Sequence, residues 1–160
     1  METLALEISD YELDRGKPMP SLKHARIQKR LVRQLEDFLA ERCEVLAEIS
    51  LAIADARMIP NVAVFTAGAL PDSVGPDYTA VAVVPRTAIE ILSPTQVIAE
   101  LLEKAGRYFT AGVQSYWLVV PELRAVAVYS APTKYRYFYN GDTLLDPTTG
   151  AEIVVSQLFD

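Results

Sequence analysis

The stretch Ala88-Ile89-Glu90-Ile91-Leu92-Ser93-Pro94-Thr95-Gln96 (residues 88–96) joins the end of an apolar strand to the start of a helix. The strand is predicted over residues 80–92, because nearly continuous apolar character is typical of a strand covered on both faces. Ser93 suits the N-cap, Pro94 the first helical position and Gln96 a capping box. We therefore predict a helix from Ser93 to about residue 111, ended by Gly112 in the left-handed conformation.

The segments on either side of this stretch show helical and strand periodicity in turn. Apolar residues recur at helical spacing over residues 21–42, whereas residues 45–53 and 62–65 have the character of strands. Further strands are predicted over residues 116–120, 125–129, 135–139 and 153–155, with a turn at Asn140-Gly141. This order predicts one α/β (α+β) domain over residues 1–160, with a mixed central sheet flanked by helices.

Composition excludes several classes of protein. The 160 residues include 15 basic and 21 acidic side chains, so bulk positive charge does not hold DNA or an anionic membrane to this protein. The single cysteine, Cys43, excludes a disulfide framework and a cysteine-rich zinc site. The first residues are acidic where a secretory signal is basic, and no apolar run approaches about 18–20 residues. We therefore expect a cytoplasmic protein that does not enter the membrane.

Glu90 is the first candidate for a functional residue, because it interrupts an otherwise apolar strand. Burying a carboxylate is unfavourable unless a metal, another cation or backbone donors compensate for it. Asn61 begins a neighbouring strand, Glu12 adds a carboxylate, and Glu100 and Lys104 lie one helical turn apart. Structural alternatives exist for Glu90, which could lie on a solvated edge or pair with an arginine, and for Glu100 with Lys104, which is a common surface pair.

The order of several motifs resembles the Uma-two family, which belongs to the restriction-endonuclease-like PD-(D/E)xK superfamily. The resemblance covers about residues 11–159. The segments that carry it are Tyr11-Glu12-Leu13-Asp14-Arg15-Gly16, Ile59-Pro60-Asn61-Val62-Ala63-Val64, Ile89-Glu90-Ile91-Leu92-Ser93-Pro94, Glu100 with Lys104 and Tyr108, and Gly112-Val113-Gln114-Ser115-Tyr116-Trp117-Leu118-Val119. The resemblance implies a restriction-endonuclease-like fold and a Mg²⁺-dependent endonuclease that hydrolyses phosphodiester bonds.

The resemblance also implies roles for individual residues. Glu90 matches the acid of the (D/E)xK element and, with residue 61, is expected to hold Mg²⁺. Lys104 matches the catalytic lysine, which this family supplies from the helix because Leu92 stands at the usual lysine position. Glu100 and Glu12 match further catalytic positions. Asn61 departs from the pattern, since it replaces the aspartate of the Pro-Asp pair and removes one negative charge from the expected metal site.

Two other features admit more than one interpretation. The cations of the first helix, Lys23, Arg26, Arg30 and Arg33, could contact the phosphates of DNA or form an ordinary solvated face. Tyr135, Tyr137 and Tyr139 alternate along a strand and could stack on bases, although cross-strand packing explains them as well.

Three functions remain open from the sequence: an endonuclease with a weakened centre, an inactive module that binds nucleic acid or protein, and a regulatory protein without nucleic acid. A homodimer is compatible with each of them.

Overall fold

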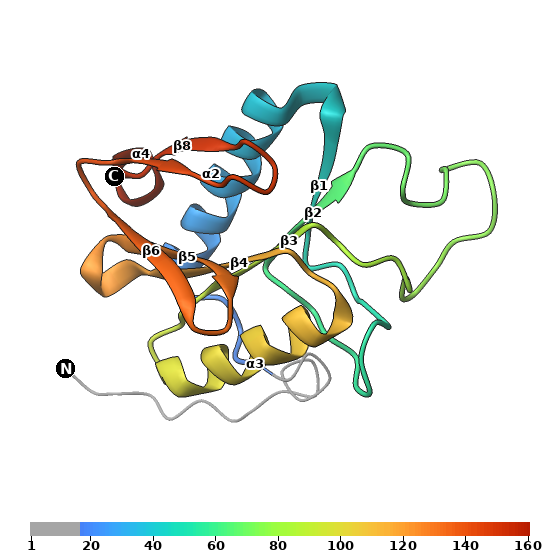
Figure 1. Ribbon diagram of the computed structural model, residues 1–160, viewed down its shortest axis with the longest axis horizontal. Coiled ribbons are helices and arrows are strands. Elements are labelled where there is room, and N and C mark those ends of the chain that lie inside the picture. Colours follow the sequence, from blue (N-terminus) through green and yellow to red (C-terminus); the bar gives the residue numbers. More distant parts are fainter. Residues whose placement is uncertain (1–16) are drawn as a thin grey trace.

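The computed structural model describes residues 17–160, in which a six-stranded sheet lies between two layers (Figure 1). One layer contains helix α2 (Leu22–Leu39), and the opposite layer contains helix α3 (Ile98–Ala111). The strands of the sheet are β1 (Cys43–Ala47), β2 (Val62–Thr66), β3 (Thr87–Ile91), β4 (Ser115–Val120), β5 (Ala125–Ala131) and β6 (Lys134–Tyr139). The α2 layer is completed by β7 (Thr143–Leu145), β8 (Glu152–Val154) and α4 (Ser156–Phe159).

The strands are ordered β1-β2-β3-β4-β5-β6, and within the described residues only β3 and β4 pair in parallel. A parallel pair needs a long crossover connection, which α3 provides. All five residues of β3 and all six of β4 are buried. The coverage on both faces that was predicted for residues 80–92 is therefore confirmed for residues 87–91.

Helix α2 forms because its sequence supplies both a cap and an apolar stripe. The Ser21 side chain accepts a hydrogen bond from the backbone N–H of His24 at 3.2 Å. The buried face carries His24, Ile27, Leu31, Leu35 and Leu39, at the spacing of helical turns. None of the helices between residues 17 and 160 is long and apolar enough to cross a membrane.

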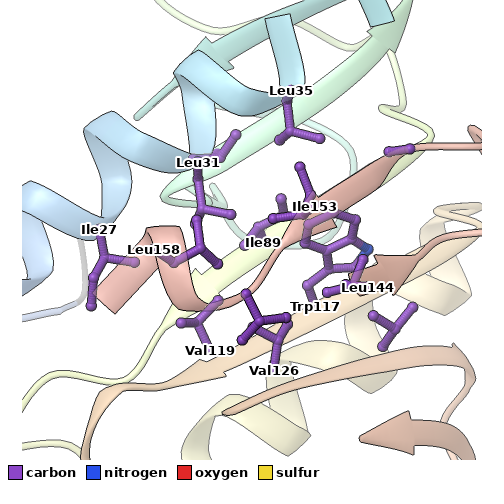
Figure 2. Packing of buried hydrophobic residues seen from close by; sticks show 14 of the residues in the cluster. Ile27, Leu31, Leu35, Ile89, Trp117, Val119, Val126, Leu144, Ile153 and Leu158 are labelled. Atoms are coloured by element: carbon purple, nitrogen blue, oxygen red, sulfur yellow. The ribbon is translucent and has the colours of Figure 1, made fainter. Parts of the chain in front are cut away.

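A hydrophobic core fills the space between α2 and the sheet (Figure 2). Ile89, Trp117 and Val119 reach it from the sheet, whereas Ile153 and Leu158 reach it from the C-terminal segment. Burying the stripe of α2 and these side chains supplies the main driving force for this half of the fold.

A second core lies between α3 and the other face of the sheet, and includes Ala88, Leu101, Tyr108 and Tyr116. Side chains alternate between the two faces of a strand. Because Ile89 and Ile91 lie in the core on the α2 side, the residues next to them in β3 point toward α3. Glu90 is one of those neighbours. Its carboxylate is therefore directed into the α3 side of the sheet.

The sequence patterns did not reveal a buried aspartate in the α2 layer. Asp146 follows β7 and is fully buried. Its Oδ2 accepts hydrogen bonds from Trp117 Nε1 and Ser115 Oγ, each at 2.7 Å, and Oδ1 accepts one from the Thr148 N–H at 2.9 Å. These hydrogen bonds connect the segment after β7 to β4, in the middle of the sheet.

The predicted start of the second helix is wrong. Helix α3 begins at Ile98 after an N-cap at Val97, rather than at Ser93. The Ser93 hydroxyl instead lies 3.1 Å from Nδ1 of the buried His24 in α2, while the Ser93 N–H donates to Gln96 Oε1. The helix ends as predicted, with Gly112 in the left-handed conformation at φ 109°.

Several strand boundaries also differ from the prediction. Residues 45–53 were predicted as one strand, but β1 ends at Ala47 and Glu48 adopts a positive φ of 55°. Residues 80–86 precede β3 and contribute only a bridge between Val81 and Leu51. Pro85 explains the break, because proline cannot donate to a strand ladder.

Candidate functional site

Glu90 lies at the centre of a buried polar cluster on the α3 side of the sheet. Its side chain is 1% exposed. Oε1 accepts a hydrogen bond from the Tyr108 hydroxyl of α3 at 3.2 Å, and Oε2 lies 3.5 Å from Lys17 Nζ. Lys17, Glu48, Asn61, Glu90 and Tyr108 together form what we call the Glu90 cluster.

Lys17 supplies the positive charge of the Glu90 cluster. Its side chain is 3% exposed, and it approaches the sheet from the segment before α2. Nζ forms ion pairs with Glu90 Oε2 at 3.5 Å and with Glu48 Oε2 at 3.8 Å. It also donates to the backbone carbonyl of Ile59. The ammonium thus contacts three oxygen atoms from β3, the β1 end and the segment before β2.

Asn61 precedes β2 and contributes both ends of its carboxamide to the cluster. Oδ1 accepts the backbone N–H of Ile91 at 2.8 Å, and Nδ2 donates to Glu48 Oε1 at 3.0 Å. The N–H of Ile91 fixes this orientation, because an amide nitrogen could not accept that hydrogen. A backbone hydrogen bond from Glu48 N–H to the Asn61 carbonyl, at 3.1 Å, holds the two segments together.

The environment of the cluster perturbs Tyr108. Burial, and after it the negative charge of Glu90, raises the pKa of the Tyr108 phenol well above its ordinary value. The hydroxyl therefore stays protonated at neutral pH and acts as a hydrogen-bond donor to Glu90.

Replacing Tyr108 by phenylalanine is expected to lower the free energy of unfolding by about 1.5–3 kcal/mol, since it removes a hydrogen bond to a charged group. Because the pKa of Tyr108 is higher in the folded than in the unfolded state, the contribution of Tyr108 to stability is fully present below about pH 10, the pKa of an unfolded tyrosine. This contribution is lost as the pH rises further. Urea denaturation from pH 7 to 11 should show a weaker alkaline decline in Tyr108→Phe.

Tyr116→Phe is a matched control, because the Tyr116 hydroxyl donates to the uncharged carbonyl of Leu101 at 2.9 Å. It should lose only about 0.5–1.5 kcal/mol. Equal losses in the two variants at pH 7 would contradict a special role of the Tyr108–Glu90 bond.

The structure brings two of the residues expected at the active site, Glu90 and Asn61, into the same cluster. The side chain of Asn61 accepts a hydrogen bond from the backbone N–H of Ile91, the residue that follows Glu90 in β3. Lys104 lies half-buried on α3, and Glu100 is exposed at the start of that helix. No hydrogen bond or ion pair joins either of them to Glu90 within the described part of the chain. Glu12 lies outside the described residues.

Lys17 and Glu48 were missed by the sequence analysis. Neither lies in a regular helix or strand, so no periodicity marks them. The only available signal was indirect: a carboxylate at Glu90 needs a nearby cation if it is buried.

The basic residues of α2 lie away from the Glu90 cluster. Lys23, Arg26 and Arg33 are exposed, whereas Arg30 is half-buried and donates to the Leu158 carbonyl at 3.1 Å. The buried face of α2 packs on the sheet face opposite to the one that Glu90 occupies. Contact of these cations with phosphates stays a prediction.

The three tyrosines of β6 form an exposed row on the α3 side of the sheet. Ring centroids are 5.1 Å apart between Tyr135 and Tyr137, and 6.2 Å apart between Tyr137 and Tyr139. Tyr135 also packs on Tyr129 of the neighbouring strand at 5.0 Å. The cross-strand packing predicted for this row is thus present, and base stacking stays a prediction.

Comparison with known protein families assigns the chain to one of them. The family model of Uma2, described as "Putative restriction endonuclease", matches residues 2–156. The chain belongs to the Uma2 family. The resemblance to the Uma-two family seen in the motifs is therefore confirmed. A comparison of this Uma2 protein with curated proteins finds no match.

A solved structure supports the fold of this Uma2 chain. The crystal structure of a "putative nuclease belonging to DUF820" from Anabaena variabilis ATCC 29413 matches with a TM-score of 0.78 and 24% identity, over 89% of this chain and 83% of that chain. The predicted restriction-endonuclease-like α/β fold is confirmed. A cryo-EM structure of a DrdV–DNA complex matches at a TM-score of 0.38 and 13% identity, over 83% of this chain and 13% of that chain, too low to establish a shared fold.

The Mg²⁺ ion implied by the Uma2 resemblance does not fit the arrangement of the site residues that the structure describes. Both oxygens of Glu90 and the Oδ1 of Asn61 already accept hydrogen bonds or an ion pair from protein groups. Among residues 17–160, no group of three or more Asp, Glu, His or Cys side chains is arranged to hold a metal. Mg²⁺ binds through carboxylates and water in a near-octahedral shell, which this arrangement lacks.

Proposed function

We propose that this protein is a restriction-endonuclease-like module that binds nucleic acid but does not hydrolyse it through a divalent cation. The observation that carries the loss of hydrolysis is the ion pair between Lys17 and Glu90, which places an ammonium at the expected metal ligand. Asn61 adds to this, since its carboxamide carries no charge and its oxygen is committed to Ile91. Because the family model is described as "Putative restriction endonuclease", nucleic acid is the first partner to test.

The charge distribution supports α2 as the binding surface. The helix carries five Lys or Arg residues and two acidic residues, a net charge of +3, in a chain whose overall charge is −6. The acids, Glu36 and Asp37, lie in its last turn. A local basic stripe of this kind attracts phosphates even when the whole protein is acidic.

Reversing two charges on α2 should weaken binding to a fluorescein-labelled DNA duplex by about tenfold or more at 50 mM salt, because phosphate contacts contribute additively. Arg26→Glu with Arg33→Glu is the suitable variant, since both side chains are exposed on α2. Arg30 is spared because it donates to Leu158. Fluorescence anisotropy in EDTA measures the affinity without any contribution from a metal.

The matched control is Arg57→Glu with Lys134→Glu, which changes the net charge by the same amount at exposed positions outside α2. It should retain most of the affinity. Equal weakening in both double variants, or no DNA binding by the wild type, would contradict α2 as the surface. Cleavage of supercoiled plasmid by the wild type with Mg²⁺, abolished in Glu90→Gln, would contradict the loss of hydrolysis.

A further inference from the structure

We infer that Lys17 is a built-in cation that occupies the position of a divalent metal ion, and that Asn61 is the substitution that makes this possible. The inference deepens the proposed function in one respect, since both take the Glu90 cluster to hold no metal. It does not depend on nucleic-acid binding.

The contacts of Lys17 have the character of a cation site. Its Nζ is surrounded by Glu90 Oε2, Glu48 Oε2 and the Ile59 carbonyl, which are the oxygen types that bind hard divalent cations. The side chains of Lys17 and Glu90 are 3% and 1% exposed, so water cannot screen the carboxylate in its place. The ammonium therefore neutralises the charge of the Glu90 carboxylate, as a metal ion otherwise would.

The amide of Asn61 is compatible with an ammonium in place of a divalent cation. Its Nδ2 donates to Glu48 Oε1 at 3.0 Å, whereas an aspartate there would turn a second carboxylate toward Glu48. Like charges at this separation repel strongly unless a cation lies between them. Among the described residues, the one ammonium of Lys17 lies against the carboxylates of Glu48 and Glu90, and an aspartate at position 61 would add a third carboxylate beside them. Positions 17 and 61 are therefore coupled through charge.

The coupling predicts that two substitutions convert the cluster into a metal site. Lys17→Met removes the ammonium while keeping an unbranched side chain, and Asn61→Asp restores a third carboxylate beside Glu48 and Glu90. Purified Lys17→Met/Asn61→Asp should gain about 5 °C or more in Tm in millimolar Mn²⁺, as expected for a ligand well above its Kd. Isothermal titration calorimetry with MnCl₂ alone, without nucleic acid, measures the affinity directly.

The controls isolate each part of the inference. The wild type and Asn61→Asp should show no Mn²⁺-dependent rise in Tm, since both keep the ammonium. Adding Glu90→Gln to the double variant should abolish the response, and Lys134→Met/Asn61→Asp should behave like Asn61→Asp alone.

Two results would overturn the inference. One is Mn²⁺ binding by the wild type that disappears in Glu90→Gln, because the ammonium would then not exclude the metal. The other is a double variant without a Mn²⁺ response. If that variant is unfolded without metal, Mn²⁺ should restore its circular dichroism spectrum, and a chain that stays unfolded counts equally against the inference. DNA binding by the wild type is unaffected by either result.

Discussion

Lys17→Met is expected to lower the free energy of unfolding by about 3–5 kcal/mol, the usual consequence of removing one partner from a buried ion pair. The substitution leaves Glu90 with the Tyr108 hydroxyl as its remaining donor among the bonds described, and leaves the Ile59 carbonyl without its ammonium. Desolvation of the unpaired carboxylate then opposes folding. Urea denaturation at pH 7, followed by circular dichroism, measures the loss.

Lys134→Met serves as the control, because Lys134 is exposed at the start of β6, and its loss should be within about 0.5 kcal/mol. Adding Glu90→Gln to Lys17→Met should recover part of the stability, since the amide removes the uncompensated charge but keeps the size of the side chain. A Lys17→Met protein as stable as the wild type, or a double variant less stable than the sum of the single changes, would show that the ion pair does not hold the site together.

Asp146→Ala is expected to cost about 3–4 kcal/mol, because it leaves buried donors without an acceptor, each of which costs about 1–3 kcal/mol. The donors are Trp117 Nε1, the Ser115 hydroxyl and the Thr148 N–H. The cavity left by the carboxylate adds to the loss. Trp117 is the only tryptophan of the chain, so its fluorescence reports both the unfolding transition and the local environment of the missing partner.

Asp55→Ala removes an exposed aspartate and should change stability by less than about 0.5 kcal/mol. Asp146→Asn keeps the size of the side chain but turns an N–H₂ group toward one set of donors, so its loss should be intermediate. A loss below about 1 kcal/mol in Asp146→Ala would mean that water replaces the carboxylate and that the network does not fasten the C-terminal segment.

The elements that the sequence predicted well are those with local signals. The apolar stripe of α2, the apolar strands β4 and β5 and the alternating tyrosines of β6 depend on residues close together in the chain. Glu90 was found for the same reason, as a charge within an apolar strand. The left-handed Gly112 at the end of α3 followed from the conformational freedom of glycine.

The features that were missed depend on contacts between distant segments. Ser93 has the sequence of a helix cap, but its hydroxyl contacts His24, which lies 69 positions away. Lys17 reaches Glu90 across 73 positions, and Asp146 reaches Trp117 across 29. A local pattern cannot reveal such contacts, because the order of strands in the sheet decides which segments become neighbours.

The crossover between β3 and β4 has a consequence for the order of assembly. Strands β4, β5 and β6 are joined by short connections and can close with little loss of chain entropy, whereas β3 reaches β4 only after the whole of α3 has been placed. A folding nucleus that contains only this meander leaves Lys17 and Glu90 in water, where neither ion needs the other. If folding begins with this meander, we expect the ion pair to form late and to slow unfolding more than it speeds folding.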